Sequence, residues 1–209
     1  MGEIVKGVMD EGKAIAGDSD LSDLYFAYGP DMDPRVLRAR GGRGEAVAIA
    51  RLADYRLAFF GHTEIWDSGM ETVVPESGSE VWGVLYRLRA LDWDRLDTWM
   101  DARLDGGGVY FHYPVDVVDL SGKTHRVRLY KKDIQGEAQL PSRDYLDLIV
   151  GGAGQQGLPM DYVLRLGRMV ARKASFPVPA RGNPNRGAFI TSDCRTCGVA
   201  ETEPEVKPC

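Results

Sequence analysis

Few side chains in this 209-residue sequence stand at spacings that are typical of a metal or redox site. The three histidines lie on separate segments, and no two of them have the spacing of metal ligands. The three cysteines, Cys194, Cys197 and Cys209, all fall near the C-terminus. A structural zinc ion needs four ligands, so a second chain would have to complete such a site. We therefore expect no metal here, and a redox role for the Cys194-x-x-Cys197 pair is a weaker alternative.

Composition and charge exclude several classes of protein. The chain has 26 basic and 31 acidic residues and a net charge of −5, which argues against a nucleic-acid-binding face. The glycine run 106–108 is not followed by Lys-Ser or Lys-Thr, so it is not a phosphate-binding loop. No run of about 18 apolar residues is present, so we expect no membrane span. The absence of cysteines from the rest of the chain favours the reducing cytoplasm.

The patterning predicts a fold that is rich in strands first and in helices later. We expect strands at 24–28, 47–60, 73–74, 81–88, 109–120 and 125–131. We expect helices after Pro34 and at 91–102, 142–150 and 161–173. Asp92 is the expected N-cap of the second helix, and Pro75 and Gly78 are expected to separate two strands. This order predicts an α+β fold around a curved sheet or small barrel.

One domain with two extensions is the expected organisation. Residues 1–22 have apolar positions at helical spacing and predict an amphipathic N-terminal helix. Residues 23–174 form the predicted domain, and 175–209 read as an irregular tail rich in Pro and Gly that contains the cysteines. The segments 1–20 and 176–209 are candidates for docking onto a protein partner.

Three stretches, taken in order, resemble the γ-glutamylcyclotransferase-like (AIG2-like) family. The first is Tyr25–Met32, which is similar to the family's tyrosine-glycine-serine-asparagine loop after its first strand. The second is Trp66–Pro75 followed by Val81–Tyr86. The third is Pro141–Leu146 with the glycine-containing segment 151–162. Together they span the predicted domain, and their combination is more specific than any one of them.

The resemblance implies a small mixed barrel with flanking helices and a cavity at one mouth. It also implies an intramolecular aminolysis that needs neither metal nor organic cofactor. In that reaction the α-amine of a γ-glutamyl amide attacks its own γ-carbonyl, releasing an amine and 5-oxoproline. The reaction requires a held conformer, a base for the α-ammonium proton and donors for the developing oxyanion.

The predicted substrate-binding residues come from the first loop and from two tyrosines. Tyr28 and Gly29 match the family's loop, and Met32 ends it. Pro30 replaces the serine and removes a backbone donor, whereas Asp31 replaces the asparagine and would repel a substrate carboxylate. Two further predicted lining residues stand where the family has tyrosines near its pocket, namely Tyr110 and Tyr145.

The sequence departs further from the family at the position of the catalytic base than it does in the first loop. A glutamate of the family's leucine-aspartate-x-x-glutamate segment corresponds to Met100, which cannot accept a proton. The adjacent Asp101 is the predicted catalytic substitute, although neighbouring helical side chains diverge by about 100 degrees. Asp97 and Glu71 are poorer candidates, and Glu71 is expected to point outward from its strand.

Two functions therefore stay open at this stage. The chain is either an enzyme that cyclises a γ-glutamyl amide or a related amide, with Asp31 favouring an amine-bearing group, or a catalytically inactive member of the fold. In the second case it binds a small molecule or docks onto a larger assembly. Retained loop residues and tyrosines favour the first function, whereas Met100 and the two extensions favour the second.

Overall fold

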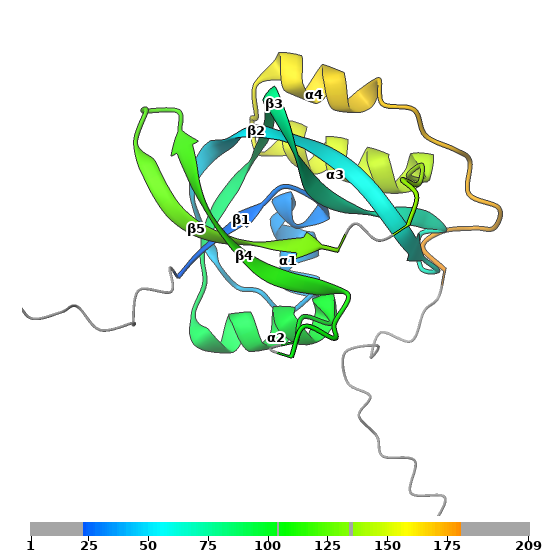
Figure 1. Cartoon of the computed structure of the whole chain (residues 1–209), viewed down its shortest axis with the longest axis horizontal. Coiled ribbons are helices and arrows are strands. Elements are labelled where there is room, and N and C mark those ends of the chain that lie inside the picture. The colour runs from blue at the N-terminus through cyan, green and yellow to red at the C-terminus, as the bar shows by residue number, and fades with distance from the viewer. Residues whose placement is uncertain (1–22, 104, 134–135, 181–209) are drawn as a thin grey trace, which may run out of the picture.

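The fold is built around a closed five-stranded barrel, as a computed structural model shows (Figure 1). The structure describes residues 23–103, 105–133 and 136–180. The strands are β1 (Leu24–Ala27), β2 (Glu45–Thr63), β3 (Ser68–Arg87), β4 (Tyr110–Asp119) and β5 (Thr124–Lys132). Their order around the barrel is β1-β3-β2-β4-β5, and a parallel pairing of β1 with β5 closes it. The expectation of an α+β fold with a small mixed barrel is confirmed.

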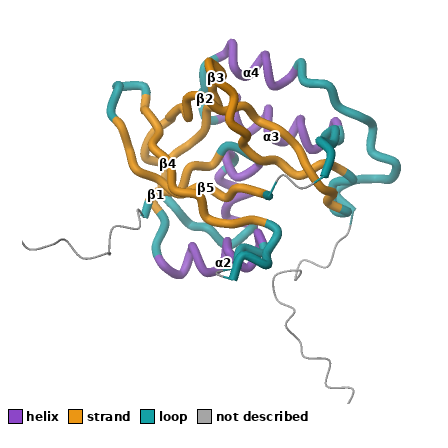
Figure 2. Tube along the Cα trace, in the orientation of Figure 1, coloured by secondary structure: helices purple, strands orange, loops and turns teal. Residues whose placement is uncertain are grey.

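Within the part of the chain that the structure describes, four helices and one short 3-10 turn flank the barrel. They are the turn η1 (Pro30–Met32) and the helices α1 (Pro34–Ala39), α2 (Ala90–Met100), α3 (Arg143–Gln155) and α4 (Met160–Gly167). In the view of Figure 2, α2 lies on one side of the barrel, and the packed pair α3 and α4 lies on the opposite side. Among the described residues, no helix is long and apolar enough to cross a membrane.

Several predicted boundaries are wrong, for identifiable reasons. Pro75 and Gly78 do not separate two strands, because β3 continues through them. The chain tolerates Pro75 there because the stretch is exposed and a register irregularity lies opposite, between Ala53 and Tyr55 of β2. α4 ends at Gly167 rather than at residue 173. The N-cap of α2 is Arg89, and the predicted cap Asp92 instead accepts the Arg89 N–H at 3.1 Å from inside the first turn.

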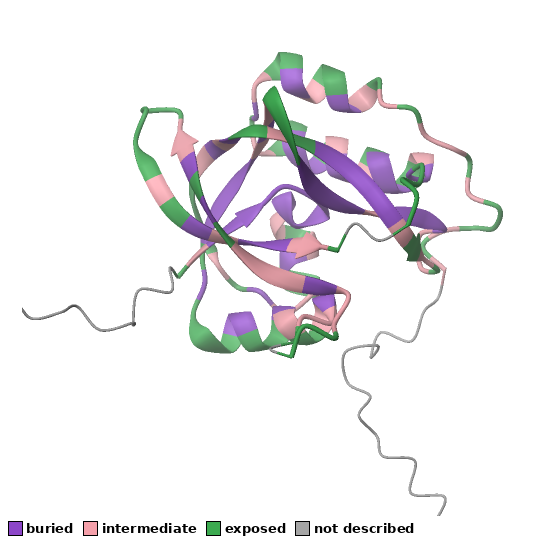
Figure 3. Cartoon of the chain, viewed as in Figure 1, coloured by how far each residue is buried: buried purple, intermediate pink, exposed green. Residues whose placement is uncertain are grey.

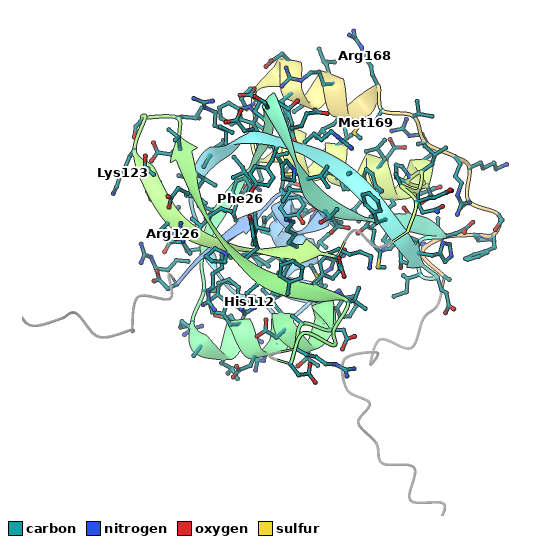
Figure 4. All side chains as sticks on the ribbon, viewed as in Figure 1. Phe26, His112, Lys123, Arg126, Arg168 and Met169 are labelled. Atoms are coloured by element: carbon teal, nitrogen blue, oxygen red, sulfur yellow. The ribbon has the colours of Figure 1, made fainter. Side chains whose placement is uncertain are left out.

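The core fills the barrel and continues under the helices. Phe26 of β1 is fully buried at the centre of the barrel, whereas Lys123 and Arg126 project from the exposed end of the β4–β5 hairpin (Figure 4). Figure 3 shows the same contrast between a buried interior and exposed outer faces. On α2, the side chains of Trp93, Leu96 and Met100 are buried and belong to this core.

The chain after α4 returns to the tip of the β2–β3 hairpin. The guanidinium of Arg172 donates to the Asp67 carboxylate at 2.6 Å, and the Ser175 N–H donates to the same carboxylate at 2.7 Å. Ala180 N–H donates to the Ile65 carbonyl at 2.7 Å. The start of the predicted tail is thus attached to the barrel. The rest of the tail, with its cysteines, and the predicted helix at 1–22 lie outside the described residues.

A close approach of backbones at Gly83 yields a first prediction. A Cβ at this position of β3 would lie 2.4 Å from the Ala27 carbonyl oxygen and 2.8 Å from the Phe26 ring. We expect Gly83→Ala to lower the free energy of unfolding by about 1–3 kcal/mol, because the barrel wall cannot yield without moving a backbone. Chemical denaturation measures this change.

The matched control is Gly151→Ala, within α3, where an added Cβ would meet no atom within 4 Å. Alanine is the better helix former by about 0.5–1 kcal/mol, so this variant should be slightly more stable than the wild type. Equal stability of Gly83→Ala and the wild type would contradict the account of barrel packing.

Candidate active site

Hydrogen bonds from tyrosine hydroxyls hold the loop after β1 in place. Tyr28 OH donates to the Tyr130 carbonyl at 2.5 Å, and Tyr86 OH of β3 donates to the Met32 carbonyl at 2.8 Å. The Met32 N–H donates to the Gly29 carbonyl at 3.1 Å, which closes the η1 turn. Pro30 begins this turn and, like the rest of 28–32, is buried. The loop is therefore a fixed element at the end of β1.

A buried ion pair fixes the acidic residue of the loop. Arg40, just after α1, donates to the Asp31 carboxylate at 2.9 Å, and both side chains are less than one-tenth exposed. Tyr25 OH donates to the second oxygen of the same carboxylate at 2.9 Å. The Asp31 charge is thus already paired within the protein. This pairing weakens the predicted repulsion of a substrate carboxylate, because Arg40 supplies the compensating charge.

Glu71 of β3 points into this region, not outward as the sequence suggested. It is 3% exposed and lies against Gly29, where an added Cβ would be 2.6 Å from Glu71 Oε1. Tyr145 OH donates to Glu71 Oε2 at 2.5 Å. Tyr110 OH donates to the Glu71 backbone carbonyl at 3.1 Å and is 3.4 Å from Oε2. The structure brings Asp31, Arg40, Glu71, Tyr110 and Tyr145 together, and we refer to them as the Glu71 cluster.

The element that delivers Tyr145 is α3, and its start is anchored to the β2–β3 hairpin. Ser142 caps α3 by accepting the Tyr145 N–H at 3.3 Å, while its hydroxyl donates to the Trp66 carbonyl at 2.7 Å. Further along α3, Gly152 passes so close to the loop that an added Cβ would lie 3.1 Å from the Asp33 nitrogen. The helix is therefore positioned at both ends against the elements that form the cluster.

Burial dominates the electrostatics of the cluster. It raises the pKa of Glu71, and the positive charge of Arg40 and the hydrogen bond from Tyr145 oppose part of that rise. Burial also raises the pKa values of Tyr110 and Tyr145 well above the ordinary value, so both hydroxyls remain protonated donors. A carboxyl with a raised pKa beside fixed hydroxyl donors is a common combination at sites that transfer protons.

The residue predicted as catalytic lies elsewhere. Asp101 follows α2 with a left-handed backbone (φ 46°), and its side chain is 43% exposed. Its carboxylate accepts from Arg103 at 2.9 Å. Met100, which precedes it, packs into the core. The catalytic role of Asp101 stays a prediction, and its surroundings are those of a surface ion pair.

Asp97, the other poorer candidate for the base, belongs to a separate polar group between α2 and the barrel. Tyr130 OH donates to Asp97 Oδ1 at 2.5 Å, and His112 Nε2 is 2.6 Å from the same oxygen. Figure 4 shows His112 between β4 and α2. The carboxylate thus ties α2 to the barrel. In the described ranges, no three His, Cys, Asp or Glu side chains gather as metal ligands.

A surface groove of about 500 Å³ lies between the outer face of the β2–β3 ribbon and α4. Its lining residues include Arg56, Glu80, Tyr162 and Arg165, and none of them belongs to the Glu71 cluster. The groove faces solvent and contains paired charges, such as Arg165 with Glu80 at 3.3 Å. The Glu71 cluster and the groove are thus separate features of the molecule.

Two cluster residues were misjudged or missed in the sequence. Glu71 lies on a part of β3 where residues of both parities are buried, Thr72 and Val73 among them, so strand alternation gave no signal that its side chain points inward. Arg40 follows a short helix in a polar stretch, and no local pattern marks it as buried. The predicted loop residues 28–32 and the two predicted tyrosines lie around Glu71. Asp101 instead pairs with Arg103.

The raised pKa of Glu71 predicts a pH-dependent stability. An unfolded chain releases this proton near the ordinary value of 4.5, whereas the folded protein retains it to higher pH. The stabilisation linked to this proton is therefore complete below that value and is lost as the pH rises through the raised pKa. Thermal unfolding across a pH series should show wild type losing stability relative to Glu71→Gln as the pH rises.

Glu76→Gln is the matched control, because Glu76 lies on the same strand but is 46% exposed. It should follow the wild-type curve. A constant difference between wild type and Glu71→Gln at every pH would show that Glu71 titrates normally.

Comparisons with known proteins show which family the chain is similar to. The sequence model of the AIG2-like family matches residues 80–166. γ-Glutamylcyclotransferase from Homo sapiens is 30% identical over 158 residues, which cover 74% of this chain and 82% of the relative. The Bos taurus protein of the same name is 32% identical over 69% of this chain and 77% of its own. A solved structure of a γ-glutamyl cyclotransferase superimposes with a TM-score of 0.69 at 28% identity, covering 74% of this chain and 92% of that one. The chain therefore belongs to the AIG2-like γ-glutamylcyclotransferase family.

Proposed function

We propose that this protein cyclises a γ-glutamyl amide or γ-glutamyl amine to 5-oxoproline and releases the amine. The observation that carries the proposal is the buried Glu71 cluster at the loop after β1, where fixed hydroxyl donors surround a carboxyl with a raised pKa. The relatives named above are γ-glutamylcyclotransferases, which supports the same class of substrate. The proposed binding residues are Tyr28, Gly29, Pro30, Asp31 and Met32 of the loop, together with the two tyrosines, Tyr110 and Tyr145.

The charge of the cluster suggests how a substrate would be oriented. Asp31 and Glu71 bring two carboxyl groups against the single guanidinium of Arg40. When Glu71 is ionised, the cluster therefore carries one negative charge in excess. An α-ammonium group neutralises that charge, whereas a second carboxylate would add to it. We infer that the amine of the substrate, rather than its carboxylate, faces Glu71.

Ring closure then depends mainly on holding the bent substrate. Bringing the amine and the γ-carbonyl into contact replaces a search through many conformers with one reactive geometry. The protonated hydroxyls of Tyr110 and Tyr145 donate to the backbone carbonyl and the carboxylate of Glu71, so they hold this side chain in place beside the substrate. No chemistry beyond proton transfer and carbonyl addition is required of the protein. In the proposal it therefore works without metal or organic cofactor.

The test is release of 5-oxoproline from a panel of γ-glutamyl amines and γ-glutamyl dipeptides. We expect product from at least one member, with the amine released in equal amount, because both come from one bond cleavage. Substrates lacking the α-amine should give none, since the nucleophile is then missing. Absence of 5-oxoproline with every γ-glutamyl compound would contradict the proposal.

A catalytically inactive binding protein is the second candidate. The packing of Met100 into the core favours it, because the residue aligned with the family's glutamate cannot transfer a proton. In that case the protein would bind γ-glutamyl compounds, seen as a rise in Tm, without making product. Docking through 1–20 and 176–209 is part of this candidate, and pull-down with a chain lacking both segments tests it. A truncated chain that retained every partner would contradict docking through them.

A further inference from the structure

We propose that Glu71, on β3, is the catalytic base of this protein and has replaced the glutamate whose usual position on α2 is taken by Met100. This inference rests on the proposed function, because it assigns a residue to that reaction. Three observations carry it: the aim of the side chain, the different surroundings of its two carboxylate oxygens, and the surface environment of the competing carboxylate.

Glu71 points at the backbone that the resemblance assigns to substrate binding. Its Oε1 is the atom that an added Cβ on Gly29 would meet first, at 2.6 Å. A substrate placed on this loop would therefore contact the Glu71 carboxylate directly.

The two carboxylate oxygens have different tasks. Oε2 accepts from Tyr145 at 2.5 Å, with Tyr110 OH 3.4 Å away, whereas Oε1 is turned toward the loop. The tyrosine thus fixes the orientation of the group and leaves one oxygen facing the substrate side. Such a second partner that orients the base is a regular feature of acid–base sites.

The proton balance of the reaction can be written with Glu71 alone. The ionised carboxylate takes one proton from the α-ammonium, and the freed lone pair of nitrogen forms the bond to the γ-carbonyl carbon. As the carbonyl re-forms and the C–N bond to the leaving group breaks, Glu71 returns that proton to the departing nitrogen. The second proton shed by the ring nitrogen passes through the regenerated carboxylate to the released amine, which leaves as an ammonium ion.

The competing carboxylate is less suited to these steps. Asp101 is 43% exposed and paired with Arg103 at 2.9 Å. A half-exposed carboxylate in a surface ion pair neither excludes water nor gains from a low dielectric. Glu71 is 3% exposed, and the hydroxyls beside its carboxylate come from α3 and β4.

The decisive experiment measures 5-oxoproline release by wild type and Glu71→Gln on the best substrate of the panel. Glutamine keeps the size of the side chain and an oxygen that can accept from Tyr145, so thermal unfolding should show a folded variant. We expect kcat to fall about a hundredfold or more, with a smaller change in KM, because general-base catalysis contributes about 10²–10⁴-fold. Glu76→Gln, on the exposed part of the same strand, should leave kcat unchanged.

The pH profile separates a base from a residue with a merely structural role. The groups that face Glu71 are Arg40, Asp31, Tyr28, Tyr110 and Tyr145. The wild-type kcat should rise with pH as Glu71 ionises, and this rising limb should disappear in Glu71→Gln. Tyr145→Phe should keep the limb but move it to higher pH, since it removes a hydrogen bond that favours the charged form.

A second variant reports on the same contact from the opposite side. Gly29→Ala places a methyl group where Glu71 Oε1 now lies and should displace the carboxylate while leaving the fold intact. We expect its kcat to fall with little loss of Tm, because the atoms that the methyl group would meet, Oε1, Cγ and Cδ, all belong to the Glu71 side chain and none to the backbone.

Three outcomes would overturn the assignment. If wild type makes 5-oxoproline and Glu71→Gln retains both the rate and the rising limb, Glu71 is not the base, although the proposed function stands. If Asp101→Asn loses product while Glu71→Gln retains it, the base is Asp101. If Glu71→Ala gains activity over wild type, Glu71 obstructs the site instead of serving it. A wild type without product from any substrate removes the proposed function and this assignment together.

Discussion

The placement of one carboxylate inside a closed barrel is the constraint on which the rest of the site depends. Glu71 loses most of its hydration, and the fold must compensate from within. The compensation comes from two separate elements, a hydroxyl on α3 and the guanidinium that follows α1, while a hydroxyl on β4 donates to the backbone carbonyl of the same residue. These contacts do not fully replace the hydration that the carboxylate loses. Glu71 is therefore easier to protonate than an exposed glutamate.

This constraint explains why segments far apart in the sequence are attached so firmly. Ser142 links the start of α3 to the β2–β3 hairpin, and Gly152 lets the same helix approach the loop after β1. Arg172 and Ser175 bind Asp67 at the hairpin tip and hold the chain that follows α4 against it. The position of Tyr145 relative to Glu71 therefore follows from contacts at some distance from either residue. A loosened α3 would change the proton affinity of Glu71 before it unfolded the protein.

Local patterns in the sequence were sufficient for the class of fold, the order of its elements and the loop after β1. They failed where long-range packing decides. Pro75 and Gly78 predict an interruption between two strands. The long β2–β3 ribbon nevertheless continues through them, because they lie at an exposed irregularity in the strand register. Glu71 read as outward because a charged residue is rarely buried, and its partners are contributed by segments that no local pattern places nearby. The sequence favours Asp101 as the base because it adjoins Met100. The helix ends at this point, however, and the Asp101 side chain pairs with Arg103 at the surface.

Burial raises the pKa of Glu71, and titration of its carboxyl carbon, followed by NMR, measures this shift directly. With ¹³C-labelled glutamate, and with Glu71→Gln to assign the resonance, we expect the titration curve to have its inflection above 4.5, the ordinary pKa of a glutamate. In Tyr145→Phe the inflection should move higher still, because the charged form loses a hydrogen bond. A Glu71 resonance that titrates at the ordinary value, and is unchanged in Tyr145→Phe, would contradict the account.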